Sequence, residues 1–225
     1  MLDRRVESFA EAIAGIGDGA TILLGGFGGA GTPLGLIAAI HAAGLRELTV
    51  VCNNGGSATA DLSLWLAAGQ VRKLVCSYPK SKANSTSSFS DLYRAGKIEL
   101  ELVPQGTLVE RIRCAGAGLG GFFTPVGAGT ALAEGKETRL IDGREHVFEK
   151  PLPGDVALLR GKQADRLGNL TYNRTARNFA PAMATAAKLV VAEVEEFVEL
   201  GALDPESVVT PGIFVDRVVR REAPQ

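Results

Sequence analysis

Short runs of branched apolar residues alternate along the chain with stretches whose apolar positions recur at helical spacing. Each run predicts a buried β-strand, and the runs occupy residues 21–24, 48–52, 73–78, 98–103, 156–160 and 189–194. Helices are expected between the first four strands, at about residues 33–43, 58–69 and 87–95. This alternation is typical of an α/β fold, and we predict an open, mostly parallel sheet with helices on both faces.

Three further segments have their own patterns. Residues 1–16 carry apolar side chains at helical spacing together with acidic and basic ones, which predicts an amphipathic helix and not a signal peptide. Residues 142–151 are expected to form a small hairpin around Asp142–Gly143. Residues 116–130 are rich in glycine and fit no helical or strand period, so we expect a structured loop near the functional site, with a surface connection as the alternative.

Length and charge limit the class of protein. The 225 residues are enough for one well-packed α/β unit, and we expect a single domain over residues 1–225. The formal net charge is −1 and no Lys/Arg block stands out, so we expect no nucleic-acid partner. Residues 20–45 contain no Asp, Glu, Lys or Arg, but their glycines and Pro33 divide them into strand, loop and helix, so we expect no membrane span.

Cysteine and histidine are sparse. Cys52, Cys76 and Cys114 are odd in number, widely spaced and set among apolar residues. They are expected to be reduced, buried thiols of a cytoplasmic protein, not disulfides or metal ligands. With His41 and His146 as the only histidines, we expect no metal site.

A glycine-rich segment follows the first of the predicted strands. Residues 18–33 read DGATILLGGFGGAGTP, which predicts a strand, a bare backbone loop and the start of a helix. The glycines permit positive φ and let a ligand touch the main chain, while Pro33 suits a first helical turn. Unpaired amides at that helix start are expected to attract a phosphate or a developing oxyanion.

The loop also contains a G-x-G-x-x-G match through Gly26, Gly28 and Gly31, which is typical of dinucleotide-binding proteins. Such a site needs an acidic residue for the ribose about 20 residues later, where this chain has Cys52, Asn53 and Asn54. The missing acid disfavours NAD binding. A second alternative is that the glycines only permit close packing of strand and helix.

The whole string resembles the N-terminal signature of family I coenzyme A-transferases, with Asp18, Gly19, Ile22–Phe27, Gly31 and Pro33 in the defined positions. The resemblance continues along nearly the entire chain. It includes VVCNNGG at 50–56, LYRAGKIELELVPQGTLVERIRCAGAG at 92–118, FFTPVGAGT at 122–130, LAEGKET at 132–138, GNLTYNRTARNF at 168–179 and ELGALDPESVVTPGIFV at 199–215. The chain therefore resembles the alpha subunits of the 3-oxoacid branch of this family.

The resemblance implies a role for the loop and a partner for the chain. The loop would approach coenzyme A and the acyl group through Gly25, Gly26, Phe27, Gly28, Gly29, Ala30 and Gly31. The family's nucleophile is a glutamate in a Ser-Glu-Asn-Gly segment of a homologous beta subunit, which forms an acyl anhydride and then a glutamyl-coenzyme A thioester.

This chain has no such segment, so it is expected to be inactive alone and to form an α2β2 assembly with a homologous beta subunit. A coenzyme A thioester would be its substrate, with no permanently bound cofactor. The glutamates of this chain are expected to lie on solvated helical faces, as at Glu110, Glu193, Glu195 and Glu196.

Neutral amides follow two of the predicted strands. Gln105 comes after the IELELV strand and Pro104, at a carboxyl end where open α/β sheets place ligands, and its amide can stabilise an oxyanion. The resemblance assigns the glutamine of V-P-Q-G-T-L, which Gln105 matches, to the oxyanion hole; the alternative is a cap on a helix beginning near Thr107. Asn53 and Asn54 are candidates for binding the acyl carboxylate or for a turn with the following glycines.

Four further residues have open roles at this point. Arg111 and Arg113 lie in the helix expected after Gln105, where salt bridging is favoured over a phosphate contact. Arg177 and Asn178 are interpreted as interface residues.

The substrate hypothesis depends on residues 77–90. Relatives acting on 3-oxoadipate carry Pro-basic-polar after Ser-Tyr, as this chain does with Pro79, Lys80 and Ser81, whereas relatives acting on acetoacetate carry Gly-Glu-Asn. A cation such as Lys80, with Lys82, suits a substrate with a second carboxylate; the alternative is that these lysines only solvate a loop. We expect transfer of coenzyme A from succinyl-coenzyme A to 3-oxoadipate. The alternatives are acetoacetate or acetate as acceptor or, from another class, a nicotinamide- or nucleotide-binding domain.

Overall fold

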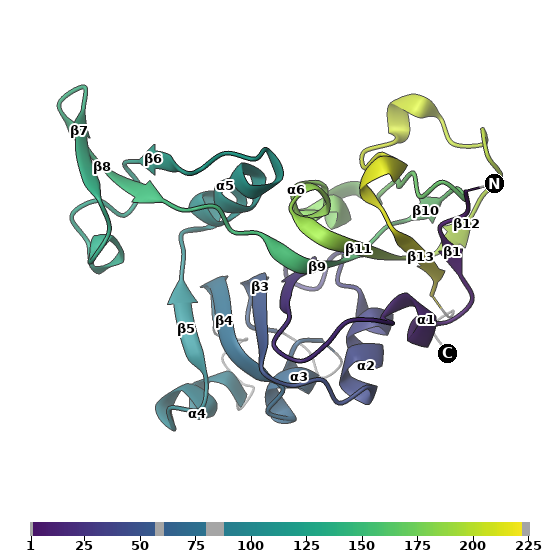
Figure 1. Ribbon diagram of the computed structural model, residues 1–225, viewed down its shortest axis with the longest axis horizontal. Helices are drawn as coiled ribbons and strands as arrows, with labels where there is room; N and C mark the ends of the chain where they lie inside the picture. The colour runs from purple at the N-terminus through teal and green to yellow at the C-terminus, as the bar shows by residue number, and fades with distance from the viewer. Residues whose placement is uncertain (1, 57–60, 80–87, 222–225) are drawn as a thin grey trace.

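The computed structural model describes residues 2–56, 61–79 and 88–221 (Figure 1). Its centre is an eight-stranded sheet of order β1-β13-β11-β9-β2-β3-β4-β5, and each neighbouring pair is parallel. The predicted strands are all present, with small differences in their ends. The bounds are β1 Arg5–Val6, β2 Thr21–Leu24, β3 Leu48–Asn54, β4 Val71–Tyr78, β5 Glu99–Leu102, β9 Gly154–Arg160, β11 Ala187–Val194 and β13 Arg217–Arg220.

Helices cover both faces of this sheet, as the sequence predicts (Figure 1). Successive residues of β2 show the division, because Ile22 and Leu24 join one apolar cluster while Leu23 joins the other. The first cluster includes residues from α1 Phe9–Ala12, α2 Leu34–Ala42, α3 Ser63–Ala67 and α4 Ser88–Arg94. The second includes residues from α5 Gln105–Gly116 and α6 Ala180–Thr185.

The strand order has one reversal, and it lies between β2 and β9. From β2 the chain runs outward through β3 and β4 to β5, then returns to place β9 on the other side of β2 before continuing to β11 and β13. Loops that leave the carboxyl ends of β2 and β9 therefore diverge. In open α/β sheets this switch point is where ligands bind.

A small antiparallel sheet extends away from the main body (Figure 1). It consists of β6 Phe122–Thr124, β8 Arg144–Glu149 and β7 Thr138–Ile141. The predicted hairpin is confirmed, because Asp142 and Gly143 form its turn with φ of 49° and 74°. The prediction that residues 116–130 are all loop is wrong for β6, since three residues paired to β8 are too short to show a period of their own.

The N-terminal prediction needs correction. Residues 1–16 do not form one helix: Arg5–Val6 is a strand paired with β13, and only Phe9–Ala12 is helical, beginning after the N-cap Ser8. Val6 and Phe9 nevertheless pack against the core, which explains their spacing. The partner strand, β13, is distant in the sequence, so the local pattern could not predict this pairing.

The remaining short elements connect these layers. Strands β10 Gln163–Ala164 and β12 Glu196–Phe197 pair in parallel. The 3-10 helices are η1 Ala131–Ala133, η2 Arg174–Arg177, η3 Pro205–Ser207 and η4 Gly212–Phe214. Within the described ranges, no helix has both the length and the apolar character that a membrane crossing needs.

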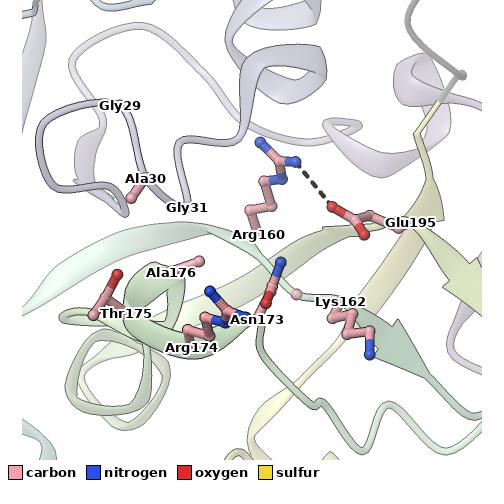
Figure 2. A pocket seen from close by; sticks show the side chains of 11 residues that line it. Gly29, Ala30, Gly31, Arg160, Lys162, Asn173, Arg174, Thr175, Ala176 and Glu195 are labelled. Atoms are coloured by element: carbon pink, nitrogen blue, oxygen red, sulfur yellow. Dashed lines mark hydrogen bonds and ion pairs between the residues drawn. The ribbon is translucent and has the colours of Figure 1, made fainter.

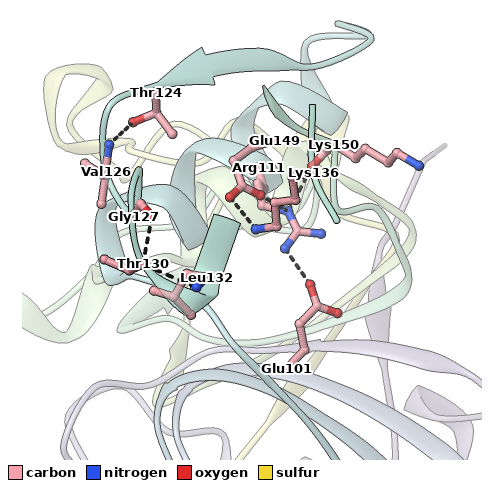
Figure 3. Close-up of polar contacts among 10 residues, drawn as sticks. All are labelled: Glu101, Arg111, Thr124, Val126, Gly127, Thr130, Leu132, Lys136, Glu149 and Lys150. Atoms are coloured by element: carbon pink, nitrogen blue, oxygen red, sulfur yellow. Dashed lines mark hydrogen bonds and ion pairs between the residues drawn. The ribbon is translucent and has the colours of Figure 1, made fainter. Parts of the chain in front are cut away.

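Arg111 of α5 joins the small sheet to the main one (Figure 3). Its Nη1 lies 2.6 Å from Glu101 Oε1 on β5, and its Nε donates to the Lys150 carbonyl at 2.8 Å and lies 3.8 Å from Glu149 Oε2 on β8. Lys136 Nζ pairs with the same Glu149 at 2.6 Å. The salt-bridge interpretation of Arg111 is confirmed, although Arg111 and Glu149 are buried and not at the surface.

Candidate active site

The glycine loop between β2 and α2 is a tight hairpin. Phe27 and Ala30 exchange two backbone hydrogen bonds of 3.0 Å, and Gly28 and Gly29 between them have φ of 57° and 94°. Two positive φ values in succession are favourable for glycine and uncommon for most other residues. The predicted bare-backbone loop is therefore present at the carboxyl end of β2.

The glycines of this loop have two different physical roles. A Cβ on Gly31 would collide with the Ala176 carbonyl, and one on Gly26 would collide with the Thr32 hydroxyl. A Cβ on Gly28 or Gly29 would meet nothing within 4 Å. Close packing thus accounts for the ends of the loop, whereas its tip, Gly28–Gly29, is open to a ligand.

Asn178 holds this loop from the other half of the chain. Its Oδ1 accepts from Gly26 N at 3.2 Å and from Phe179 N at 2.7 Å, and its Nδ2 donates to the carbonyls of Ala30 at 3.1 Å and Ala176 at 2.8 Å. The Asn178 backbone has φ of 27°, which is a strained value for a residue with a side chain. Sequence reasoning interpreted Asn178 only as an interface residue and missed this support.

The helix start after the loop does not present free amides. The Leu36 N–H donates at 3.0 Å to Glu193 Oε2, a carboxylate that also lies next to Gly35. Pro33 is the N-cap residue and does not lie within the first turn. The prediction of a phosphate or oxyanion at these amides is therefore wrong, because Glu193 already occupies the positive end of α2.

Glu193 itself was expected on a solvated helix face, and that expectation is also wrong. It lies on β11 and is 1% exposed. Burial raises the pKa of its carboxyl, against the opposing effect of the backbone hydrogen bonds that it accepts. Glu195 and Glu196 are exposed but follow or form strands, and Glu110 alone of the four lies on a helix, where it pairs with Arg113 at 2.7 Å.

Hydrogen bonds connect the predicted amide residues to the glycine loop. Gln105 Nε2 donates to Asn53 Oδ1 at 2.7 Å, and Asn53 Nδ2 donates to Asn54 Oδ1 at 3.4 Å. The same Asn54 oxygen accepts from Gly28 N at 3.3 Å. The structure thus brings together Gln105, Asn53 and Asn54, which the sequence placed at the ends of two separate strands.

The alternative role of Gln105 as a helix cap is not supported. Helix α5 begins at Gln105 itself, and its N-cap, Pro104, makes no side-chain capping bond. Gln105 is exposed at the carboxyl edge of the sheet, just after β5. Its Nε2 carries two hydrogens, so one remains for a ligand while Asn53 accepts the other.

A cavity of about 320 Å³ lies at the switch point, on the β9 side of the glycine loop (Figure 2). Gly29–Gly31 forms one wall and Asn173–Ala176 another. Charged side chains line it as well: Arg160 at the end of β9, Lys162 just after it, Arg174 of η2, and Glu195 after β11. Sequence reasoning did not single out these cations.

The three thiols of the chain are buried, and they are not placed to bind a metal ion with other described residues. Cys52, Cys76 and Cys114 are free and buried, as predicted. Burial raises the pKa of the Cys52 thiol well above its ordinary value and that of Cys76 to about 12, so neither is a nucleophile near neutral pH. Among the described residues, no group of three His, Cys, Asp or Glu side chains is placed to hold a metal ion.

Three predicted residues remain to be placed. Lys80 and Ser81, the candidates for binding a second carboxylate, lie outside the described residues. Arg113 is exposed and paired with Glu110, so it has the salt-bridge role favoured by the sequence.

Comparisons with known proteins identify the family of the chain. Residues 6–221 match the coenzyme A transferase family. One of the subunits of the 3-oxoadipate CoA-transferase of Pseudomonas putida is 56% identical over 219 residues, covering 97% of this chain and 94% of that one. The corresponding subunit of the succinyl-CoA:3-ketoacid coenzyme A transferase of Xanthomonas campestris pv. campestris (strain B100) is 46% identical over 223 residues, covering 99% and 90%. Each of these relatives is one subunit of a larger enzyme.

A solved structure shows the same architecture in a longer chain. The acyl-CoA transferase YdiF of Escherichia coli O157:H7 superposes with a TM-score of 0.85 at 25% identity and covers 97% of this chain. This chain spans 47% of that protein, or about half its length. The resemblance drawn from the glycine loop is thereby confirmed over nearly all residues, and the chain belongs to the coenzyme A transferase family.

Proposed function

We propose that this chain is the alpha subunit of an enzyme that moves coenzyme A from succinyl-coenzyme A to 3-oxoadipate. One observation carries the proposal: Gln105, Asn53, Asn54 and Gly28 form a continuous set of hydrogen bonds at the carboxyl edge of the sheet. Neutral donors fixed in this way suit a reaction in which negative charge develops on an acyl carbonyl oxygen.

The nucleophile is proposed to be a glutamate in a Ser-Glu-Asn-Gly segment of the beta subunit. Its carboxylate attacks the thioester carbonyl, the C–S bond breaks and coenzyme A leaves as a thiolate, which gives an acyl-glutamyl anhydride. The thiolate then attacks the glutamyl carbonyl, releasing the acyl group as a carboxylate and leaving a glutamyl thioester. The incoming 3-oxoacid carboxylate reverses both steps.

In this scheme the alpha subunit supplies electrostatic stabilisation. The second hydrogen of Gln105 Nε2 is the proposed donor to the oxyanion, and Asn53 fixes the direction of that amide. The open tip Gly28–Gly29 lets the substrate approach the main chain closely. No permanently bound cofactor is needed, because a carboxylate is the nucleophile.

The choice of 3-oxoadipate is supported by the 56% identity to a chain of a 3-oxoadipate enzyme, against 46% for a chain of a 3-ketoacid one. Acetoacetate or acetate remains the alternative acceptor. We also propose an α2β2 assembly in the cytoplasm, a location in keeping with three free buried thiols. Because both apolar clusters pack on one sheet, residues 1–225 are proposed to act as one domain.

Replacing Gln105 by alanine tests the proposed role of its amide. We expect Gln105→Ala to lower kcat of the reconstituted complex by about two orders of magnitude, since an oxyanion donor is removed. The matched control is Gln163→Ala, because Gln163 contacts Glu196 on the surface and lies outside the hydrogen-bonded set. If kcat of Gln105→Ala stays within a few-fold of the wild type, the amide is not the oxyanion donor.

The acyl choice has its own measurement. The purified pair should show a kcat/KM for 3-oxoadipate at least tenfold above that for acetoacetate, with succinyl-coenzyme A as donor. Equal values would remove the substrate assignment and leave the transferase class intact.

A further inference from the structure

The cavity at the switch point carries excess positive charge. Arg160, Lys162 and Arg174 line it, together with the single carboxylate of Glu195 (Figure 2). None of these side chains belongs to the hydrogen-bonded set of Gln105, which lies toward β3 and β5. The cavity is therefore a separate feature of the same sheet edge.

Glu195 does not neutralise the cavity, because two arginines share it. Arg160 Nη2 lies 3.0 Å from Glu195 Oε1, and Arg221 Nη1 lies 3.5 Å from the same oxygen. Lys162 and Arg174 form no ion pair with any of the residues the structure describes, and both are exposed. Two cations thus remain available to a negatively charged group.

The position of the cavity indicates that its cations bind a ligand and do not only face solvent. Its cations come from the carboxyl end of β9 and from η2, and its opposite wall is the glycine backbone that follows β2. Arg174 is held at φ 52°, an uncommon conformation for a residue other than glycine. Such backbone conformations persist where the surrounding structure supports them, and they are concentrated at binding and active sites.

We propose that this cavity binds an oxyanion group, a carboxylate or a phosphate, that belongs to one of the enzyme's two substrates. The inference rests on the proposed function. Lys162 supplies a point charge and Arg174 a planar fork of donors that matches either oxyanion. Two sources share this chemistry: the distal carboxylate of 3-oxoadipate and a phosphate of coenzyme A.

The test uses the assembled alpha–beta enzyme with Arg174→Gln, Lys162→Gln and the double variant. Arg177→Gln is the matched control, because Arg177 lies on the same 3-10 helix and is exposed but does not line the cavity. Binding is measured by titration calorimetry without any thioester, with adipate, butyrate, coenzyme A and 3′-dephospho-coenzyme A as probes. Steady-state KM values are then measured with each substrate.

Each cavity variant should weaken one anionic probe about tenfold, the effect of losing one charge-assisted hydrogen bond, and Arg177→Gln should not. Weaker adipate binding with unchanged butyrate binding identifies the distal carboxylate of the acyl group. Weaker binding of coenzyme A identifies a phosphate, and an unchanged affinity for the dephospho form would assign it to the 3′-phosphate.

Two results overturn the inference. One is that all four dissociation constants stay within twofold of the wild type in the double variant. The other is that the variants fail to assemble with the beta subunit, which would make the cavity part of the subunit interface. A wrong proposed function would give a different result, namely a wild-type complex without transferase activity. The binding measurements need no turnover, so they test the cavity independently of that activity.

Discussion

Asn178 occupies an unusual backbone conformation and uses its whole amide group at the same time. Each half of the amide makes two hydrogen bonds, and one from each half goes to the glycine loop. At φ 27° an asparagine is strained, whereas glycine would not be. Two substitutions of Asn178 can therefore separate the effect of backbone strain from that of the side-chain hydrogen bonds.

Asn178→Ala and Asn178→Gly should both lower kcat/KM by about tenfold or more, because either change releases the glycine loop. Their stabilities should differ, since glycine relieves the strained backbone. We expect the glycine variant to be more stable than the alanine variant by about 1 kcal/mol, measured by urea unfolding. Equal stability would show that the backbone is not strained at this position, and full activity would show that the loop does not depend on the amide.

Which site residues the sequence could predict depends on whether their role is local. Asn53 and Asn54 end β3 and Gln105 comes shortly after β5, so the rule for carboxyl ends found them. Arg160 ends β9 and Lys162 comes shortly after it, but they approach the glycine loop only because β9 lies beside β2. That strand order is a long-range property, and the local pattern of polar and apolar residues does not contain it.

At the scale of elements, α2 has an internal partner for its positive end. The amide of Leu36 donates to the buried carboxylate of Glu193, more than 150 residues later in the chain. The helix dipole and this hydrogen bond favour the charged carboxylate, whereas burial disfavours it. Burial is the larger effect, and it raises the pKa of Glu193 above its ordinary value of 4.5.

The sign of this shift gives a pH prediction for Glu193. A raised pKa in the folded state means that the stabilisation is fully present below pH 4.5 and is lost as pH rises through the folded pKa. Glu193→Gln keeps an acceptor for Leu36 and does not ionise, so its stability relative to the wild type should increase from pH 5 to pH 8.

Urea unfolding at the two pH values measures this difference, with Glu196→Gln as the exposed control. Glu193→Ala should cost about 1–3 kcal/mol at either pH, because the buried amide loses its acceptor. A relative stability of Glu193→Gln that falls as pH rises would contradict the raised pKa.

Elements were predictable where the local pattern decides them. The runs at 21–24 and 156–160 became β2 and β9 because consecutive branched residues are buried on both faces of a parallel sheet. Strands β1 and β6 were missed, because two or three residues carry no period and their partners are distant. Glu193 was misplaced for a different reason: it lies within the strand predicted at 189–194, and its burial depends on contact with the distant start of α2.

At the scale of the whole molecule, the Arg111 cluster connects the projecting sheet to the central one (Figure 3). Arg111 is 10% exposed as a side chain and contacts carboxylates of both sheets. Arg111→Ala should therefore lower the free energy of unfolding by about 1.5–3 kcal/mol, since Glu101 and the buried Glu149 each lose one of two cationic partners. Arg113→Ala, on the same helix but with an exposed pair, should have little effect on thermal unfolding.

The same cluster predicts sensitivity to acid. Burial alone would raise the pKa of Glu101, but hydrogen bonds from Lys73 and Arg111 outweigh it and lower the pKa below its ordinary value of 4.5. The resulting stabilisation is present above pH 4.5 and is lost as pH falls through the lowered pKa. Glu101→Gln should be less acid-sensitive than the wild type between pH 5 and pH 3, followed by circular dichroism. An identical acid transition in both proteins would show that Glu101 does not contribute.

The pairing of β1 with β13 sets the order in which the chain can complete its sheet. Among the described strands β1 pairs only with β13, so Arg5 and Val6 stay without their partners Val218 and Val219 until β13 has been synthesised. The edge of β11 that faces β13 also remains open until then. Folding during translation therefore proceeds around an incomplete sheet edge, and loss of β13 would leave β1 without its partner strand as well.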